Sequence, residues 1–193
     1  NDLNLIKEIR EVELYSGFNR PYSGAMTEIM SRLRNRKSSV SIVSTISGHK
    51  ISSDHWYREP GEGTRICGNL GHWIDLTVEI FNSIVGGLDE LKITYIAADE
   101  NEFDDNFVLV LRNGQGDIST VCLNSRIEPL NGIHEHIQVQ ADKLLADIED
   151  FRVLKIQEQN TLSTFKFSPK DVGHKGSLKR LLQSNYDKNR WYR

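Results

Sequence analysis

Hydrophobic residues recur along the chain with two different periods, and the change falls near Gly86-Gly87. Upstream of these glycines, apolar residues three and four positions apart predict one helix that begins near Pro21 and another over residues 65–84. Alternating runs at 12–18 and 40–46 predict strands before and between these helices. Downstream, a period of two predicts strands at 91–97, 106–112, 118–124, 133–140, 151–157 and 164–167, followed by a helix over 175–186.

This order of elements is an α+β pattern. A chain of 193 residues, 38% of them hydrophobic, is large enough to bury one core, so we predict a single domain. The net charge of −3 argues against a nucleic-acid binder, which usually carries a basic excess. No apolar run approaches the length of a membrane-spanning helix. We therefore expect neither nucleic acid nor a membrane among the partners of this protein.

Other sequence features exclude several kinds of site. The chain has no GxGxxG after a strand and no Walker A, HExxH or GxSxG motif. Cys67 and Cys122 are too few and too far apart for a disulfide framework or a CxxC metal site, and we expect buried thiols of a cytosolic protein. His134 and His136 lie on one face of a predicted strand, and no third or fourth zinc ligand lies nearby in the sequence. We expect surface histidines and no metal site.

Five short segments carry more specific information. They are FNRPYS at 18–23, DHW at 54–56 with PGEGTRICGNLGHWIDL at 60–76, DNF at 105–107, DFRVL at 150–154 and DVGH at 171–174. In this order they resemble the GFNRRFSP, DHW with P-x-x-GGGRI-x-GE-x-CHFIDL, DNF, DFR-x-L and D-K-GH segments of Gfo/Idh/MocA-type oxidoreductases. The resemblance covers about residues 11–183. It does not include the N-terminal nucleotide-binding half of that family, with its Gly-rich loop and EKP lysine.

The resemblance implies a fold and a function. The fold is a large, mostly antiparallel sheet with helices on one face, similar to the C-terminal domain of dihydrodipicolinate reductase, and the other face serves oligomer contacts. We expect residues 1–10 to be a remnant of the interdomain connection and 11–193 to be the substrate-binding and oligomerisation domain. NAD or NADP would be bound mainly by the absent half and would exchange a hydride with a sugar, nucleotide-sugar or cyclitol hydroxyl. Without that half, we expect this chain to be inactive.

His72 is the catalytic residue that the resemblance implies. Imidazole titrates near neutrality, so it could accept the hydroxyl proton as hydride leaves, or hold that hydroxyl in place. The alternative is a histidine satisfied inside a helix–sheet interface. One helical turn earlier, many members of the family carry an aspartate where this chain has Gly68, and Asn69 and Thr64 also depart from the motif. The acid–base pair could therefore be the absent lysine with His72, or a water could substitute.

The candidate substrate-binding residues belong to two segments. Asn19 and Arg20 follow the first predicted strand, and the guanidinium could grip a phosphate, a carboxylate or sugar hydroxyls. The alternative for Arg20 is a tie to a carboxylate such as Asp75. The second segment is the loop that should line the mouth of the cleft, where an aromatic and a basic side chain suit a sugar face or an anionic group. Its candidates are Asp54, His55, Trp56 and Arg58, and hydrophobic anchoring of the loop is the alternative for Trp56.

Two functional classes follow from these observations. The first is the substrate-binding and oligomerisation domain of an NAD(P)-dependent oxidoreductase, with a small sugar-type substrate and a homo-oligomer formed through the open sheet face. The second is a non-catalytic sugar-binding or dimerisation module with the same fold, which Gly68 and Asn69 favour. A Gly-rich loop and an EKP lysine upstream of this chain would favour the enzyme.

Overall fold

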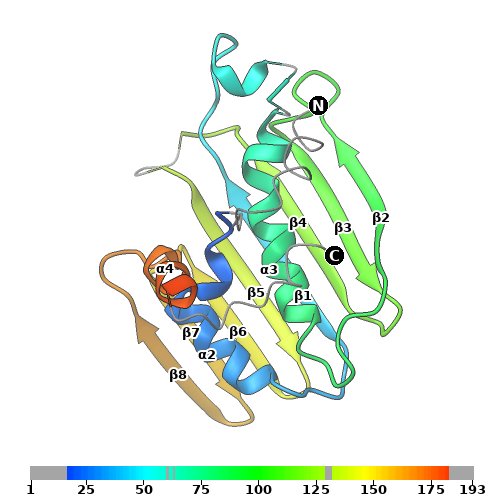
Figure 1. Cartoon of the computed structure of the whole chain (residues 1–193), viewed down its shortest axis with the longest axis vertical. Helices are drawn as coiled ribbons and strands as arrows, with labels where there is room; N and C mark the ends of the chain where they lie inside the picture. Colours follow the sequence, from blue (N-terminus) through cyan, green and yellow to red (C-terminus); the bar gives the residue numbers. More distant parts are fainter. Residues whose placement is uncertain (1–16, 60, 63, 129–131, 183–193) are drawn as a thin grey trace.

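The computed structural model describes residues 17–182 apart from 60, 63 and 129–131, and every statement below concerns those residues. They form an eight-stranded sheet in the order β2-β3-β4-β1-β5-β6-β7-β8, with helices on one face (Figure 1). Neighbouring strands are antiparallel except β1 and β4, which are parallel. The predicted α+β class with a large, mostly antiparallel sheet is confirmed.

The strands are β1 (Val40–Ser47), β2 (Leu91–Ala98), β3 (Phe107–Asn113), β4 (Ile118–Asn124), β5 (His134–Ala141), β6 (Leu144–Glu149), β7 (Val153–Glu158) and β8 (Thr161–Lys166). The helical elements are η1 (Arg20–Tyr22), α2 (Gly24–Leu33), η2 (Trp56–Arg58), η3 (Ile66–Leu70), α3 (Gly71–Phe81) and α4 (His174–Leu182). Of these, η1 and η2 are short 3₁₀ turns, and η3 is a π-helical segment that runs directly into α3.

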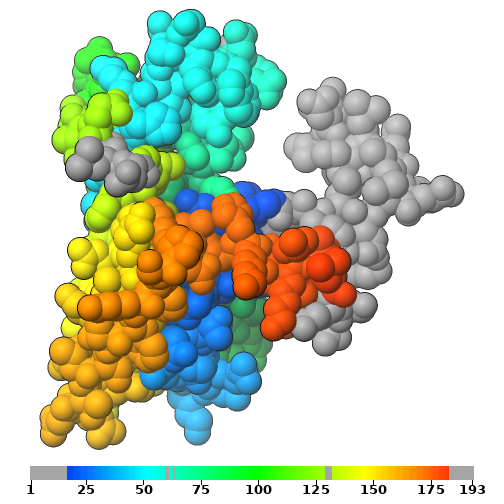
Figure 2. All heavy atoms as spheres, turned by 90° about the vertical axis from the view of Figure 1, so that its left-hand side faces the viewer, coloured from blue at the N-terminus to red at the C-terminus, as the bar shows by residue number. Residues whose placement is uncertain are grey.

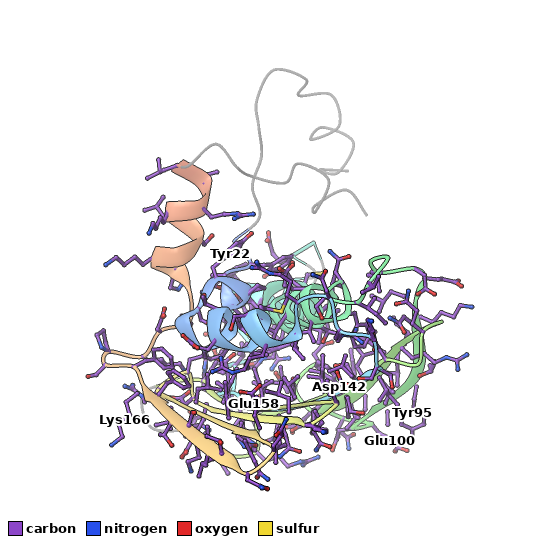
Figure 3. All side chains as sticks on the ribbon, turned by 90° about the horizontal axis from the view of Figure 1, so that it is seen from below. Tyr22, Tyr95, Glu100, Asp142, Glu158 and Lys166 are labelled. Atoms are coloured by element: carbon purple, nitrogen blue, oxygen red, sulfur yellow. The ribbon has the colours of Figure 1, made fainter. Side chains whose placement is uncertain are left out.

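The core lies between the sheet and the helices. In the central strand β1, Ile42 and Ile46 are buried beneath the helices, whereas Val43 is exposed on the opposite face. Figure 3 shows α2 and α3 side by side on the inner face of the curved sheet. Each helix buries one side, because its apolar residues are three and four positions apart. These buried residues are Ala25, Met26, Ile29 and Leu33 of α2 and Trp73, Leu76, Thr77, Ile80 and Phe81 of α3.

The sequence analysis did not predict β6, which pairs with β5 and β7. The turns on either side of β6 contain no glycine or proline, the usual signals of a break between strands. Instead Asp142, Asp150 and Phe151 adopt positive φ values of 51°, 51° and 50°. The predicted strand at 151–157 consequently begins at Val153.

Some of the predicted helices and strands begin or end at different residues in the structure. The first helix begins at Gly24 rather than Pro21, because Pro21 lies in η1 and Ser23 caps α2 by accepting from the Met26 amide. The helix predicted over 65–84 ends at Phe81. The predicted strand at 12–18 and the expected interdomain remnant at 1–10 fall mostly or wholly outside the described residues, and Gly17 and Phe18 are not in a strand.

The expectation of buried thiols is wrong. Cys67 is exposed on η3, and Cys122 is only half-buried on β4. Cys122 points toward the open face of the sheet because its neighbours Val121 and Leu123 point into the core. No helix among the described residues combines the length and the apolar character needed to cross a membrane.

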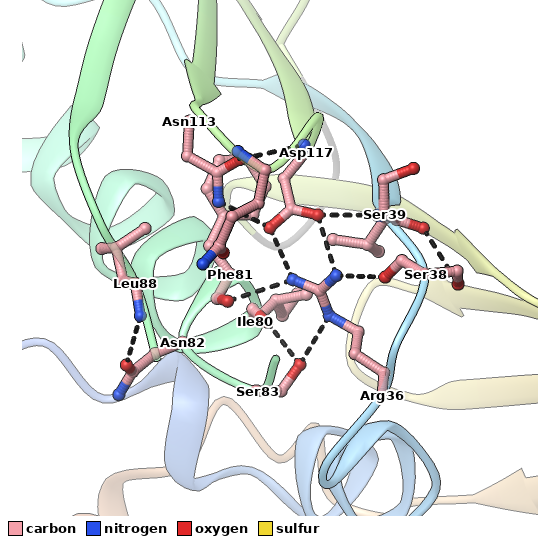
Figure 4. Close-up of polar contacts among 12 residues, drawn as sticks. Arg36, Ser38, Ser39, Ile80, Phe81, Asn82, Ser83, Leu88, Asn113 and Asp117 are labelled. Carbon is pink, nitrogen blue, oxygen red and sulfur yellow. Dashed lines mark hydrogen bonds and ion pairs between the residues drawn. The ribbon is translucent and has the colours of Figure 1, made fainter. Parts of the chain in front are cut away.

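A buried ion pair ties the loop after α2 to three other parts of the fold (Figure 4). The Arg36 guanidinium donates to both carboxylate oxygens of Asp117, in the turn between β3 and β4, and the two side chains are 1% and 0% exposed. Arg36 also donates from Nε to Ser83 Oγ at 2.9 Å and from Nη2 to Phe81 O at 3.0 Å, at the end of α3. Asp117 accepts from the Val40 amide, at the start of β1.

We predict that Asp117→Ala lowers the free energy of unfolding by about 3–5 kcal/mol, because it leaves the Arg36 charge buried and unpaired. Urea unfolding of this chain, followed by circular dichroism, measures the effect. Glu158→Ala is the matched control: it removes a partner 3.0 Å from Arg32 Nε, but Glu158 is 47% exposed. This control should cost no more than about 1 kcal/mol. Equal losses in the two variants would contradict the structural role of the Arg36–Asp117 pair.

Candidate functional site

His72 lies near the start of α3, immediately after the π-helical segment η3. Residues 64–81 form one continuous helical run, except that five of them, Ile66–Leu70, make π rather than α turns. A π segment widens the helix locally, and such segments occur frequently at functional sites. The site therefore begins at a local irregularity that the regular 3.6-residue period of the sequence does not reveal.

The His72 side chain packs against an aromatic ring. Its Nδ1 atom is buried and has no hydrogen-bond partner among the described residues. The Phe18 ring packs edge-on against the imidazole, with 5.3 Å between the ring centroids. Phe18 can approach this closely because Gly71 has no side chain: a β-carbon at Gly71 would lie 2.6 Å from the Phe18 ring.

Burial, together with the nearby Arg20 and His174, lowers the pKa of His72 to about 4. The imidazole is therefore neutral at pH 7. A neutral imidazole can accept a hydrogen bond or a proton, which a protonated one cannot. A partly buried acceptor that has no partner within the fold is a feature of a site that awaits a ligand.

Arg20 lies beneath this site in a buried network centred on Glu135 of β5. Its Nε donates to Glu135 Oε1 at 3.0 Å, and its Nη1 donates to Asn19 Oδ1 at 3.2 Å. Trp73 Nε1 also donates to Glu135 Oε1, at 2.8 Å. Arg20 is therefore paired with a carboxylate, as the alternative drawn from the sequence held, and that carboxylate belongs to Glu135.

Lys170 completes the network from the C-terminal side. Its Nζ lies 3.6 Å from Glu135 Oε2 and also pairs with Asp150. The side chain of Glu135 is 1% exposed, so its charge needs these partners. The sequence analysis did not single out Glu135 or Lys170. The available signal was the alternation in β5, since exposure of His134 and His136 implies that the residue between them faces the core.

Asn19 is also buried, and its side chain fixes the segment that leads into α4. Its Nδ2 donates to Val172 O at 2.8 Å. Gly173, at φ +95°, lies so close to the Asn19 backbone that a β-carbon there would be 2.1 Å from Asn19 O. Asp171 accepts from the Gly24 amide at 2.8 Å, at the start of α2. These contacts bring the 171–174 motif to the 18–23 motif, and His174 to the neighbourhood of His72.

The four predicted loop residues lie between β1 and α3, at one end of the molecule (Figures 1 and 2). Trp56 is 56% exposed and stacks on His55, with 5.7 Å between the ring centroids. His55 Nδ1 accepts from the Tyr57 amide and so caps η2. Asp54 is exposed, and a hydrogen bond from Ser52 lowers the pKa of its carboxyl group. Arg58 donates to Ile51 O at 3.0 Å and pairs with Asp105, so this side chain anchors the loop.

The DNF turn and the DHW loop each contact the helix that carries His72. Arg65, at the start of the helical run, is 3% exposed, and its Nε lies 3.2 Å from Asp105 Oδ1. Tyr57 packs on Gly68 within η3: a β-carbon at Gly68 would lie 2.9 Å from Tyr57 Cζ and 3.1 Å from its hydroxyl oxygen. The structure thus fastens the DHW loop and the DNF turn to the segment that carries His72. Neither Tyr57 nor Asp105 was predicted as a site residue.

The open face of the sheet carries a separate depression of about 300 Å³. It is lined by His134, His136, Asp147, Glu149, Val153 and Lys155. His136 Nε2 lies 3.5 Å from Asp147 Oδ1. Within the described part of the chain, no group of three histidine, cysteine or acidic residues is arranged to hold a metal ion.

No family model and no curated protein sequence matches the chain. Solved structures do match it. A Gfo/Idh/MocA family oxidoreductase from Vibrio cholerae superimposes with a TM-score of 0.62 at 18% identity, over 94% of this chain and 56% of its own. A UDP-N-acetylglucosamine 3-dehydrogenase from Acidithiobacillus ferrooxidans gives a TM-score of 0.65 at 11% identity, over 95% and 56%.

A mutant of a 3-ketoreductase from Actinomadura kijaniata, in complex with TDP-benzene and NADP, gives a TM-score of 0.66 at 12% identity, over 97% of this chain and 60% of its own. The chain thus spans little more than half the length of the structures it matches. At these identities the likeness establishes the fold. The fold implied by the sequence motifs is therefore confirmed: the chain folds as a part of Gfo/Idh/MocA oxidoreductases does.

We predict that His72 makes the stability of the folded chain depend on pH. The pKa of its imidazole is about 4 in the folded state, against 6.5 for an unperturbed histidine. As the pH falls below 6.5, the unfolded chain binds a proton that the folded chain binds only near pH 4, so the free energy of unfolding decreases. Between about pH 7 and about pH 5 the wild type should lose more stability than His72→Gln.

Urea unfolding at the two pH values gives this comparison, and an NMR titration of the His72 ring gives the pKa directly. Parallel losses in the wild type and His72→Gln, or a titration midpoint at the ordinary value of 6.5, would contradict the burial of the imidazole.

Proposed function

We propose that this chain is the substrate-binding half of an NAD(P)-dependent oxidoreductase that acts on a hydroxyl of a sugar, nucleotide sugar or cyclitol. The observation that carries the proposal is the extent of the fold match, which covers nearly all of this chain but little more than half of each oxidoreductase. We further propose that a nucleotide-binding domain precedes residue 1 in the complete protein. The UDP-N-acetylglucosamine 3-dehydrogenase supports a sugar-type substrate, and the 3-ketoreductase, in complex with TDP-benzene and NADP, supports a nucleotide-linked substrate.

The described residues contain no glycine-rich loop of the kind that binds a dinucleotide, so we assign NAD or NADP to the preceding domain. The cofactor, when bound there, supplies the acceptor or donor of the hydride. The residues of this chain face the substrate. In the oxidative direction, the carbon that bears the hydroxyl loses a hydride and the hydroxyl oxygen loses a proton.

His72 accepts that proton in our proposal. Its pKa of about 4 keeps the imidazole neutral at pH 7, and Nδ1 has no partner within the described residues. Arg20 and Asn19 are engaged with Glu135, Val172 and each other. We therefore assign them a positioning role: they hold the floor of the site beneath the substrate and add a positive potential to it.

The DHW loop supplies the remaining contacts. The exposed face of Trp56, backed by His55, is suited to pack on the apolar face of a sugar ring. The exposed Asp54 carboxylate can accept hydrogen bonds from sugar hydroxyls. Arg58, with 27% of its side chain exposed, can offer donors to an anionic group such as a phosphate while it remains paired with Asp105.

The open sheet face supports self-association. Exposed apolar side chains lie on it in three strands: Val43 is 46% exposed, Tyr95 58% and Ile118 44%. Val43, Thr120, Val110 and Tyr95 are successive partners across four strands, so they form one continuous row. No helix among the described residues covers this face (Figure 3). We propose that a second copy of the chain covers it.

We predict that His72→Ala in the complete protein lowers turnover by about 100-fold or more, because the substrate hydroxyl then lacks its proton acceptor. Steady-state assays with NAD and NADP and a panel of sugars, nucleotide sugars and cyclitols provide the measurement. His49→Ala, which removes an exposed imidazole from the loop after β1, should retain full activity. An unchanged rate in His72→Ala would exclude the proposed role. Sugar binding with no turnover in the wild type would instead favour a non-catalytic binding module.

We predict that the isolated chain forms dimers or larger oligomers, and that Val43→Glu dissociates them by placing a charge in the interface. Sedimentation velocity at high micromolar concentration measures the mass. Val85→Glu is the matched control, because Val85 is 58% exposed but lies in the loop after α3. A monomeric wild type would contradict association through the sheet.

A further inference from the structure

We propose that Tyr57 is a further substrate-contacting residue of this site, and that its phenolic hydroxyl hydrogen-bonds the same substrate hydroxyl as His72. This inference rests on the proposed function and deepens it by adding a second group to the reacting end of the substrate. Three features carry it: the position of the phenol over Gly68, the tilt of helical side chains toward the N-terminus, which brings His72 toward Gly68, and the buried Nδ1 of His72, which has no hydrogen-bond partner among the described residues.

The phenol of Tyr57 packs against Gly68. A β-carbon at this position would lie 2.9 Å from Tyr57 Cζ, 3.1 Å from Cε2 and 3.1 Å from the hydroxyl oxygen. The polar end of the ring therefore rests on the bare backbone of the π-helical segment. Any side chain at position 68 would occupy the same space, so the glycine and the tyrosine form a matched pair.

We expect the His72 side chain to point toward Gly68. In a helix the Cα–Cβ bond tilts toward the N-terminus, and a side chain covers the turn before its own Cα. For His72 that turn contains Gly68, four residues earlier. Residues four apart lie on the same face of a helix, so Gly68 and His72 share a face. The π turn, which holds one residue more than an α turn, ends between them at Leu70. The phenol on Gly68 and the imidazole of His72 therefore converge on one side of the helix.

The loop holds Tyr57 firmly from the other side. Its backbone amide donates to His55 Nδ1 at 3.2 Å. Its ring packs edge-on against Trp56 and His55, with 4.1 Å and 5.1 Å between centroids. Arg58, the next residue, is anchored to Asp105 and to Ile51 O. These contacts position the ring, and the hydroxyl at its far end lies over Gly68.

The buried Nδ1 of His72 has no hydrogen-bond partner among the described residues, and the Tyr57 hydroxyl interacts electrostatically with the Arg65 guanidinium. One substrate hydroxyl can satisfy both groups, because it donates its proton to the neutral imidazole and accepts a hydrogen bond from the phenol. The phenol then stays in contact with the oxygen as His72 takes the proton. The site thus selects a substrate with a free hydroxyl at the reacting carbon.

The test uses two substitutions in the complete protein that alter the hydroxyl in different ways. Tyr57→Phe removes the oxygen and keeps the ring. Gly68→Ala keeps the oxygen but displaces it, because the new β-carbon would overlap the ring. That displacement affects the far end of a flexible side chain, so the variant should fold. We expect each change to lower kcat/KM about tenfold, which is the effect of one lost hydrogen bond. Because both changes remove the same hydrogen bond, kcat/KM of the double variant should be no lower than that of the more impaired single variant.

His49→Ala, which removes an exposed imidazole from the loop after β1, is the control and should leave kcat/KM unchanged. A loss of turnover in His72→Ala with full kcat/KM in Tyr57→Phe would overturn the role of Tyr57 and leave the proposed function standing. If the proposed function itself is wrong, the result differs: wild type, Tyr57→Phe and His72→Ala all lack turnover with every substrate tested. That result would also overturn the substrate role of Tyr57.

An NMR titration of this chain tests the convergence of the two side chains without any activity. In Gly68→Ala, displacement of the ring exposes the imidazole to water, so the pKa of His72 should rise from about 4 toward 6.5. In Tyr57→Phe the ring stays in place, and the pKa should stay low. An identical His72 titration in the wild type and Gly68→Ala would show that Tyr57 does not cover the imidazole, and it would overturn the inference.

Discussion

The fold of this chain depends on the burial of one carboxylate, Glu135, in the strand next to the central one. A buried charge is stable only when it is paired and hydrogen-bonded, and here the partners come from segments far apart in the sequence. Arg20 lies in the first motif, Trp73 lies on α3 and Lys170 precedes α4. Because these residues must meet at Glu135, the segments that carry them meet as well. Phe18, two residues before Arg20, and His72, directly before Trp73, consequently come into contact.

Much of the fold could be predicted from the periods of the sequence, because a strand with one covered face has to alternate and a helix on a sheet has to bury one side. β6 was missed because aspartate and phenylalanine adopt the left-handed turns that glycine usually marks. His72 and the DHW loop could be identified by their motifs. Glu135 was missed although the alternation of β5 places it on the core face, because the sequence does not reveal which partners pair with a carboxylate there. Tyr57 was missed for a different reason: its contact is a glycine, which has no side chain to reveal it.

The two faces of the sheet divide the roles proposed for this protein. The covered face bears the helices, and the candidate site lies at the start of α3. The open face bears an apolar row on β1 to β4 and a depression lined by polar residues on β5 to β7. Alternation along each strand makes this division possible, because neighbouring residues face opposite sides. His136 and Glu135 illustrate it: one lines the outer depression, and the other supports the inner site.

The π-helical segment also affects how many residues its part of the chain can hold. Arg65 is held at one end of the segment by Asp105, and Trp73 is held beyond the other end by Glu135. Between these two fixed points the chain accommodates one residue more than an α-helix would hold. Because the π turns take up this extra residue, loss of one residue there would convert the segment to α-helix without turning the two anchored ends relative to each other. Both buried pairs could then persist, so in this short stretch the chain can lose one residue and keep its anchors.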